Sequence, residues 1–251
     1  MLLRSLLVKK RCFKERGNRH LSLYIFGDSI TNGNYGIGYK EYLSEHYVTK
    51  GYDGATLGKI LTFSHAHLRK IEHNNVKIVY QGGANDLLFT YFSHFSNGWS
   101  SYIKKKEAIE DSIEQWKISI EKKVKTIQTT YPSFTLYLCT IAIEASFSHS
   151  EIMSLTVEYN KAIKEIAAHL SIGVVDLFAS FSSLLEDKVV GDYIAPGEDS
   201  LRLDAKYINK DEDKAASLSE SRNLVLSVDG LHPNKKGATC IAKTIMDEVF
   251  I

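Results

Sequence analysis

The sequence predicts a three-layer α/β/α domain built on a mostly parallel sheet, and three observations support this. Short apolar runs alternate along the chain with longer segments of helical periodicity, which is typical of a parallel sheet covered by helices on both faces. The chain has 251 residues, enough for one large domain with a substantial core, and it shows no internal repeat. Polar clusters follow the apolar runs, where open sheets of this kind bind ligands.

The first half of the chain supplies two expected strands with a helix between them. Leu21–Phe26 is an apolar run that stops at Gly27, and we expect it to be a buried strand. A helix is expected next, because apolar residues recur every three or four positions at Leu57, Ile60, Leu61, Leu68 and Ile71. The apolar run Val76–Tyr80 is the second expected strand.

The second half continues the alternation. A long helix with a charged opposite face is predicted from the apolar positions Ile109, Ile113, Trp116, Ile120, Val124 and Ile127, and Pro132 ends it. A β-prone run, Phe134–Ile141, follows. Another helix is predicted from Ile152, Leu155, Tyr159, Ile163, Ile166 and Leu170. Gly173–Phe178 is the last expected strand, and a helix with its apolar face over 238–249 closes the chain.

Two segments do not fit this alternation. Residues 88–102, "LFTYFSHFSNGWSSY", are dense in aromatic residues and show no helical or strand period. We expect them to form a substrate pocket wall, the alternative being rings that fill the local core. Residues 191–223 are polar, and we expect an irregular insertion there.

Charge divides the chain into a basic extension, residues 1–20, and one domain, residues 21–251. Seven of the 31 Lys and Arg residues but only one of the 30 acidic residues lie in 1–20, so the domain carries a net charge of −5. This balance argues against a nucleic-acid partner. Three separated cysteines predict neither a disulfide framework nor a metal site. We expect no signal peptide and no transmembrane segment, and hence a cytoplasmic protein.

Three polar clusters carry residues suited to nucleophilic catalysis. Ser29 follows the first strand, Asn85 follows the second, and Asp229 and His232 lie three residues apart before the last helix. Serine becomes a useful nucleophile when a base removes its proton, and histidine is the usual base near neutral pH. A carboxylate on the other ring nitrogen fixes the tautomer, and an amide can hold a developing oxyanion.

These clusters, in this order, resemble the SGNH hydrolase superfamily, also called GDSL-type lipases and acylhydrolases. "GDSIT" is similar to the family's first block, "GGAND" to the block with the oxyanion asparagine, and "DGLHP" to the last block with its Asp-x-x-His. The block with the oxyanion glycine is best matched by Gly54 in "YDGAT", with Gly51 as a weaker choice. The resemblance implies the SGNH hydrolase fold, with a flavodoxin-like sheet.

The resemblance further implies hydrolysis of carboxylic esters through an acyl-enzyme, with no metal or organic cofactor. Ser29 would be the nucleophile, His232 the base and Asp229 its orienting acid, while Ser29, Gly54 and Asn85 would form the oxyanion hole. An O-acetyl group on a carbohydrate is the favoured substrate. Alternatives in the same superfamily are an O-acyltransferase acting on a glycan, a lipase and a thioesterase. A non-catalytic carbohydrate-binding module is the alternative of another class.

Three further residues are assigned to substrate binding: Asp28, Phe92 and Trp99.

Other roles for the candidate residues remain open. Ser29 could cap a helix, Asn85 could brace a turn, and Gly54 could be a plain turn glycine. His65 and His67 resemble a metal pair, but spacing of two on a helix points side chains apart, so no metal site is expected.

Overall fold

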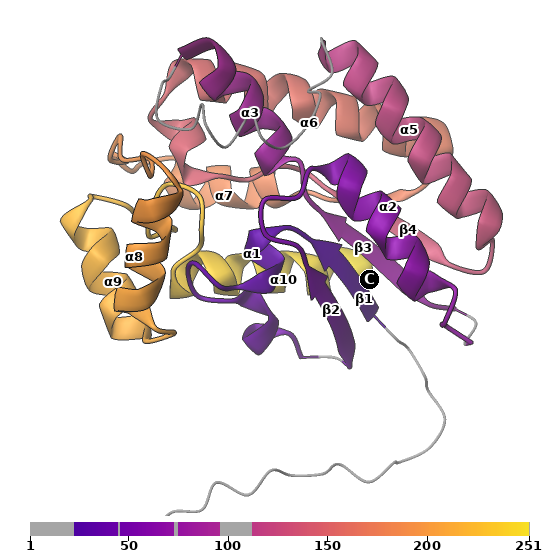
Figure 1. Ribbon diagram of the computed structural model, residues 1–251, viewed down its shortest axis with the longest axis horizontal. Coiled ribbons are helices and arrows are strands. Elements are labelled where there is room, and N and C mark those ends of the chain that lie inside the picture. Colours follow the sequence, from indigo (N-terminus) through magenta and orange to yellow (C-terminus); the bar gives the residue numbers. More distant parts are fainter. Residues whose placement is uncertain (1–22, 45, 73–74, 96–111, 251) are drawn as a thin grey trace, which may run out of the picture.

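In the computed structural model, residues 23–44, 46–72, 75–95 and 112–250 are described. Within them, parallel strands form one sheet in the order β2-β1-β3-β4-β5 (Figure 1). The strands are β1 (Leu23–Gly27), β2 (Tyr47–Gly51), β3 (Lys77–Gln81), β4 (Thr135–Cys139) and β5 (Gly173–Val175). Gly27 lies in register with Gly51 and Gln81, so three strands end at one edge. This strand order is the flavodoxin-like one.

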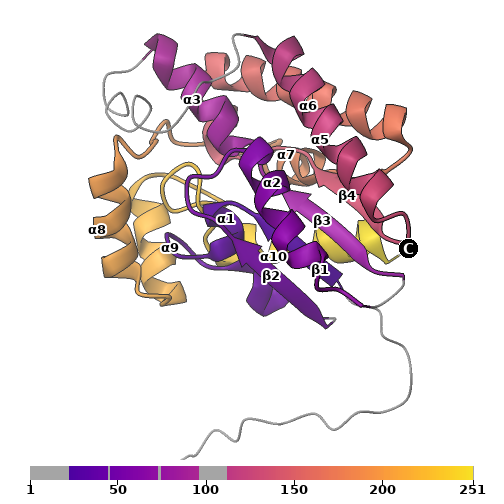
Figure 2. The ribbon, with the colours of Figure 1, turned by 45° about the vertical axis from the view of Figure 1, so that its right-hand side comes forward.

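One face of the sheet is covered by four helices, which Figures 1 and 2 show stacked above it. They are α2 (Leu57–Leu68), α3 (Ala84–Phe95), α5 (Ile113–Thr130) and α6 (Ser150–Leu170). Phe26, Tyr80 and Leu138 point from the strands into this layer and are almost fully buried. The larger of the two core clusters among the described residues therefore lies on this face.

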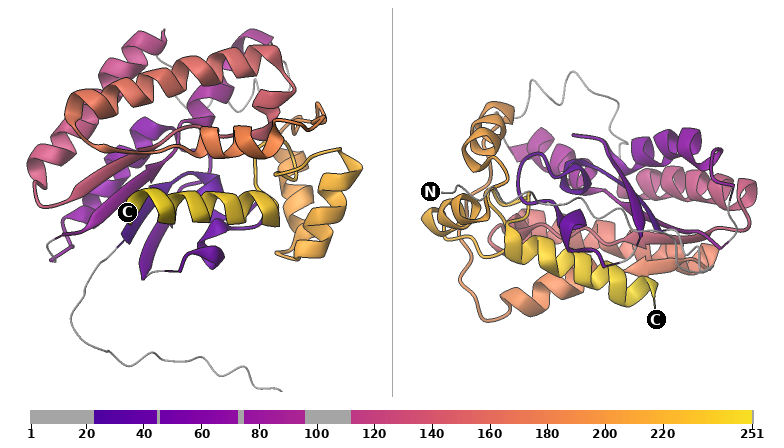
Figure 3. Two further views of the ribbon diagram at one scale, coloured as in Figure 1. Left: turned by 180° about the vertical axis from the view of Figure 1, so that it is seen from behind. Right: turned by 90° about the horizontal axis from the view of Figure 1, so that it is seen from below.

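The other face packs against α7 (Leu177–Leu185), α10 (Lys235–Val249) and the 3₁₀ helix η1 (Tyr39–Tyr42), as the view from behind in Figure 3 shows for α7 and α10. Ile25, Val79 and Cys139 point to this side. Each is the strand neighbour of a residue that faces the opposite layer, as the period of two in a strand requires. The two layers confirm the predicted three-layer α/β/α fold.

Four further elements lie near the carboxyl ends of the strands. They are α1 (Ser29–Asn32), the 3₁₀ helix η2 (Glu144–Phe147), α8 (Glu198–Ile208) and α9 (Glu212–Ser221). Helices α8 and α9 lie beside each other on the α1 side of the molecule (Figure 1). The prediction that 191–223 is irregular is therefore wrong. Only Leu201 and Ile208 of α8 are buried, so its apolar stripe is too sparse to recognise in a polar sequence.

The prediction that the aromatic stretch lacks helical periodicity is also wrong for residues 88–95, which belong to α3. The helix starts at Ala84, and its buried residues Leu87, Leu88 and Phe92 follow helical spacing from that start. A pattern counted from residue 88 omits the first turn of α3, so its helical spacing is difficult to recognise. Residues 96–102 of the stretch lie outside the described residues.

The remaining differences concern strand ends and one edge strand. The expected strand 173–178 ends at Val175, because Asp176 caps α7 by accepting the Ala179 N–H. Strand β2 was not predicted; it is a short edge strand with alternating half-buried and exposed residues. Helix α5 is described from Ile113, and its predicted start at Ile109 lies outside the described residues. The basic extension 1–20 also lies outside them.

Candidate active site

The turn that carries Ser29 is shaped by Gly27 and Asp28. A Cβ atom on Gly27 would lie 2.0 Å from the Thr31 Oγ1, so only glycine allows the chain to fold back this tightly. The Asp28 Oδ1 then caps α1 by accepting the Ile30 N–H at 2.9 Å. Ser29 is consequently the first residue of a short helix at the carboxyl end of β1, and its side chain is buried.

Side-chain hydrogen bonds fasten this turn to the next strand. The Thr31 hydroxyl donates to the Gln81 Oε1 at 2.6 Å, and the Tyr39 hydroxyl donates to the Thr31 Oγ1 at 2.8 Å. All three side chains are buried. Because Gln81 is the last residue of β3, the position of Ser29 is tied to the rigid centre of the sheet rather than to a free loop.

The loop before α10 brings a histidine and a carboxylate to Ser29. The Ser29 Oγ lies 2.9 Å from the His232 Nε2, although the two residues are 203 positions apart. The His232 Nδ1 lies 2.7 Å from the Asp229 Oδ2. The Asp229 Oδ1 accepts the N–H groups of Leu231 and His232 at 3.0 and 2.6 Å. This is the geometry of a nucleophile, a base and an orienting acid.

Burial and charge set the protonation of His232. Burial lowers the pKa of the imidazole, but the charge and hydrogen bond of Asp229, with smaller contributions from Asp28 and Asp53, outweigh it. The pKa of His232 therefore lies above its ordinary value of 6.5. The raised pKa makes His232 a stronger acceptor for the serine proton than a free imidazole would be.

Asp28 is fully buried behind the nucleophile. Its Oδ2 has no hydrogen-bond partner among the described residues. Burial raises the pKa of Asp28 to about 6, and the Ile30 N–H, the charge of His232 and the nearby Gln81 amide lower it only in part. Asp28 does not belong to the described lining of the cavity beside Ser29, so its assignment to substrate binding stays a prediction.

A cavity of about 80 Å³ opens beside Ser29 and His232. Gly54 and Asn85 line it, so the structure brings both predicted oxyanion residues to the nucleophile. Gly54 has a φ of 69°, which favours glycine. The Asn85 Nδ2 donates one hydrogen to the Ala55 carbonyl at 3.0 Å, and its second hydrogen remains for another acceptor.

The rest of the cavity wall comes mostly from two helices. Helix α3 contributes Leu88, Phe89 and Phe92, which places the predicted residue Phe92 at the cavity. Trp99 lies outside the described residues. Helix α8 contributes Leu201 and Glu198, and Glu198 accepts a hydrogen bond from Arg202 at 2.7 Å.

Sequence analysis missed five of the lining residues: Tyr35, Asp53, Glu198, Leu201 and Leu231. The Tyr35 ring lies over His232, with 5.0 Å between the ring centroids. Glu198 and Leu201 stand in a segment that was expected to be irregular. One residue in that segment did indicate a helix. Asp211 is a typical helix-capping residue, and in the structure it caps α9 by accepting the N–H groups of Asp213 and Lys214.

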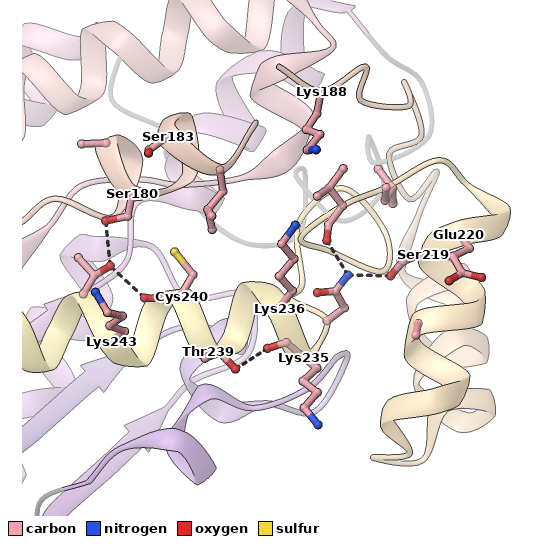
Figure 4. A pocket seen from close by; sticks show the side chains of 17 residues that line it. Ser180, Ser183, Lys188, Ser219, Glu220, Lys235, Lys236, Thr239, Cys240 and Lys243 are labelled. Carbon is pink, nitrogen blue, oxygen red and sulfur yellow. Dashed lines mark hydrogen bonds between the residues drawn. The ribbon is translucent and has the colours of Figure 1, made fainter. Parts of the chain in front are cut away.

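A second, larger groove of about 1210 Å³ lies between α7, α9 and α10 (Figure 4). Its described lining is rich in lysine and hydroxyl side chains and includes neither Ser29 nor His232. The loop before α10 adds Val225 and Asn234 to this lining, and there the Asn234 amide donates to the Ser219 Oγ and the Val225 carbonyl, both at 3.1 Å. Of these two cavities, the smaller one is therefore the one that Ser29 and His232 line.

Two other features of the described residues bear on function. They contain no group of three or more His, Cys, Asp or Glu side chains that could hold a metal ion. His65 and His67 contact different rings, those of Tyr131 and Phe26, as their spacing on α2 predicts. No helix among the described residues is both long and apolar enough to span a bilayer.

Comparison with known proteins agrees with this site. A family model described as GDSL-like Lipase/Acylhydrolase matches residues 23–245. No curated protein sequence matches the chain closely enough to count as a relative. One similar solved structure is a catalytic mutant of an acetylxylan esterase from Geobacillus stearothermophilus, with 17% identity, a TM-score of 0.60, and coverage of 92% of this chain and 95% of that one.

Two further solved structures extend the comparison. An acetyl xylan esterase named AlAXEase has 14% identity, a TM-score of 0.58, and coverage of 92% of this chain and 100% of that one. A member of the lipolytic protein G-D-S-L family from Veillonella parvula has 17% identity, a TM-score of 0.53, and coverage of 92% and 98%. Identities this low establish the shared fold, and the family match carries the assignment. The chain belongs to the GDSL-like lipase/acylhydrolase family of carboxylic ester hydrolases.

Proposed function

We propose that the protein hydrolyses carboxylic esters through an acyl-enzyme on Ser29. The observation that carries this proposal is the continuous chain of short contacts from the Ser29 Oγ through His232 to Asp229. His232 accepts the hydroxyl proton at Nε2 as the Ser29 Oγ attacks the acyl carbon. Asp229 holds the proton on Nδ1, so that Nε2 faces the serine as an acceptor, and it stabilises the imidazolium that forms.

The negative charge that develops on the substrate carbonyl oxygen needs donors that are already in place. The Ser29 N–H stands at the first position of α1, where a backbone N–H has no acceptor within its own helix. The Gly54 N–H and the second Asn85 amide hydrogen complete the proposed oxyanion hole. Because these groups are fixed by the fold, little reorganisation is needed when the charge appears.

The second half of the reaction uses the same residues. The imidazolium of His232 donates its Nε2 proton to the departing alkoxide, which leaves as the alcohol. His232 then accepts a proton from water, the resulting hydroxide attacks the acyl carbon, and Ser29 is released with its proton restored. The free acid is the second product.

The cavity limits the acyl group that the site can hold. Its volume of about 80 Å³ is roughly half that of an engineered protein cavity that accommodates benzene, about 150 Å³. Leu88, Phe89 and Phe92 make its inner wall apolar. An acetyl group fits this size and polarity. Since two of the similar structures are named acetylxylan esterases, we propose that the substrate is an O-acetyl ester of a carbohydrate.

Two activity measurements test the proposal. The purified protein should hydrolyse p-nitrophenyl acetate faster than butyrate or octanoate esters, and it should release acetate from acetylated xylo-oligosaccharides. Added sugar acceptors should not divert the acyl group. A preference for octanoate would favour a lipase, and acetyl transfer to the acceptor would favour an acyltransferase.

A matched pair of serine variants tests the nucleophile. Ser29→Ala should lose ester turnover by several orders of magnitude, because the covalent route is removed. Ser64→Ala, a buried serine of α2 that contacts Tyr80, should keep it. A fluorophosphonate should add one equivalent of mass at Ser29 in the wild type. Labelling at another serine, or an active Ser29→Ala protein, would refute the assignment.

A further inference from the structure

We propose that Glu144 is a positioning residue, whose buried carboxylate clamps the loop that carries Asp229 and His232 and so sets the orientation of the base. The inference rests on the proposed function, in which these two residues activate Ser29. Glu144 begins η2, just after β4, and contacts none of the three triad side chains through a hydrogen bond recorded among the described residues. It therefore acts through the loop.

The carboxylate of Glu144 is fully buried and accepts four hydrogen bonds from the loop. Its Oε1 accepts the Val225 N–H at 2.5 Å. Its Oε2 accepts the N–H groups of Leu226 and Ser227 at 2.9 and 2.7 Å, and the Ser227 hydroxyl at 2.6 Å. The donors lie 81 to 83 positions further along the chain, so this is a tertiary connection between the sheet edge and the catalytic loop.

This carboxylate makes no ion pair with Lys, Arg or His among the described residues, so loop donors alone balance its burial. An ionised carboxylate away from water is strongly unfavourable unless its oxygens are hydrogen-bonded. If the loop moved away, Glu144 would be left buried without partners. The loop is therefore held at one distance and one angle, whereas neutral contacts would tolerate a shift.

The clamp reaches Asp229 through two neighbouring contacts. The Ser227 Oγ, which donates to Glu144, also accepts the Gly230 N–H at 3.0 Å. The next residue of η2, Ala145, donates its N–H to the Gly230 carbonyl at 2.9 Å. Asp229 lies between the two anchored residues, so its backbone cannot rotate without breaking one of these bonds.

The outer side of the loop is held by neutral hydrogen-bonding groups and by one cation, Arg222, whose side chain is only 15% exposed. The Ser219 hydroxyl donates to the Ser227 carbonyl at 2.7 Å, and the Asn234 amide donates to the Ser219 Oγ and the Val225 carbonyl. Arg222 donates to the Val228 carbonyl at 2.5 Å but also pairs with Asp204. Glu144 thus supplies the negative charge on the inner side of the loop.

Kinetics of two variants test the clamp. In Glu144→Gln an NH₂ group replaces one carboxylate oxygen, so a donor faces the N–H groups of the loop and cannot accept from them. Ser227→Ala removes the hydroxyl hydrogen bond and leaves Glu144 intact. Because small misplacements of catalytic groups can cost up to about a hundredfold in rate, we expect at least a tenfold lower kcat for p-nitrophenyl acetate. KM should change less than twofold. Ile166→Val, a buried core change in α6, is the stability control.

Two readouts separate misplacement of the base from simple loss of stability. Asp229, Asp28 and Asp53 are the charged groups that act on His232, and Tyr35 packs on its ring. If Asp229 is displaced, its hold on the imidazolium weakens, so the acid limb of kcat/KM should move to lower pH in Glu144→Gln. The downfield NMR resonance of the His232 Nδ1 proton should also shift or disappear. Neither should change in Ile166→Val.

The NMR measurement does not depend on any substrate. A wild type that hydrolyses no ester would refute the proposed function, and the resonance would still show whether Glu144 positions Asp229. The clamp is refuted if Glu144→Gln and Ser227→Ala both keep the wild-type resonance, or if their kcat falls no further than that of Ile166→Val. Loss of the resonance together with lower kcat in either folded variant supports it.

Discussion

The buried carboxyl of Asp28 allows a prediction about the free energy of unfolding that can be tested without any substrate. We expect Asp28→Asn to stabilise the protein at alkaline pH relative to acidic pH. The change removes a charge that the fold satisfies only in part, since burial outweighs the groups that stabilise it and the Asp28 Oδ2 accepts no hydrogen bond among the described residues. The asparagine oxygen can still accept the Ile30 N–H, so the cap of α1 is kept.

The magnitude follows from the pKa of Asp28. Its value of about 6 in the folded protein exceeds the ordinary 3.8, so ionisation opposes folding. The penalty is small below about pH 3, where the carboxyl is largely protonated in both states, and it grows as the pH rises through the ordinary value of 3.8 to about 6. Above that window it reaches about 3 kcal/mol. Between about pH 4.5 and pH 8, some 2 kcal/mol of it should develop.

Urea denaturation of wild type and variant at these two pH values measures the effect. The difference between the two stability changes cancels any packing effect that is the same at both pH values. Asp176→Asn is the control whose effect on stability should not change between these two pH values. Burial would raise the pKa of Asp176, but Lys164, the Ala179 N–H and Thr140 outweigh it and lower that pKa. That stabilising charge is already almost fully developed at pH 4.5, above the ordinary value of 3.8, so Asp176→Asn should cost nearly the same stability at both pH values.

The reasoning about Asp28 fails if Asp28→Asn gains no stability between the two pH values, or loses some. Either result would mean that Asp28 ionises in the folded protein as easily as in the unfolded chain. The carboxylate would then have a partner, such as an ordered water molecule, that balances its charge. If Asp176→Asn also gained stability between the two pH values, the cause would be a general effect of pH and not the charge of Asp28.

Three further changes address the reaction. When kcat/KM is plotted against pH, the midpoint of its acid limb should lie above pH 6.5. Asp229→Asn should move this midpoint to lower pH and lower kcat. A midpoint that does not move would show that Asp229 does not set the pKa of His232. Asn85→Ala should lower kcat by about 10²–10³, and a loss confined to KM would make Asn85 a binding residue. Phe92→Ala should shift the acyl preference from acetate to longer chains and lower stability by about 3–5 kcal/mol; an unchanged chain-length profile would remove Phe92 from the acyl wall.

The layers of the fold could be predicted from the sequence because they leave local signals, and local signals also pointed to the candidate site residues. Apolar spacing identified α2, α5, α6 and α10, and the ends of β1 and β3 located Ser29 and Asn85. The register of the parallel strands then brings those two residues to one edge, as the fold class requires.

What escaped prediction depends on contacts between distant segments. Nothing near Glu144 in the sequence indicates its role, because its partners are backbone N–H groups more than 80 positions away. Tyr35 packs on His232 from a loop with no periodic pattern. The contribution of Leu201 to the cavity depends on where α8 is placed, and its sparse apolar stripe does not announce a helix.

The separation of Ser29 from His232 also has a consequence for when the protein becomes active. With 203 positions between them and synthesis at about 5–20 residues per second, roughly 10 to 40 s pass between the two residues leaving the ribosome's active centre. During that time the chain holds Ser29 without His232. The loop with His232 leads into α10, which packs against β5, α7 and η1. Because such long-range closure is slow in folding, the contact between Ser29 and His232 should be among the last to form.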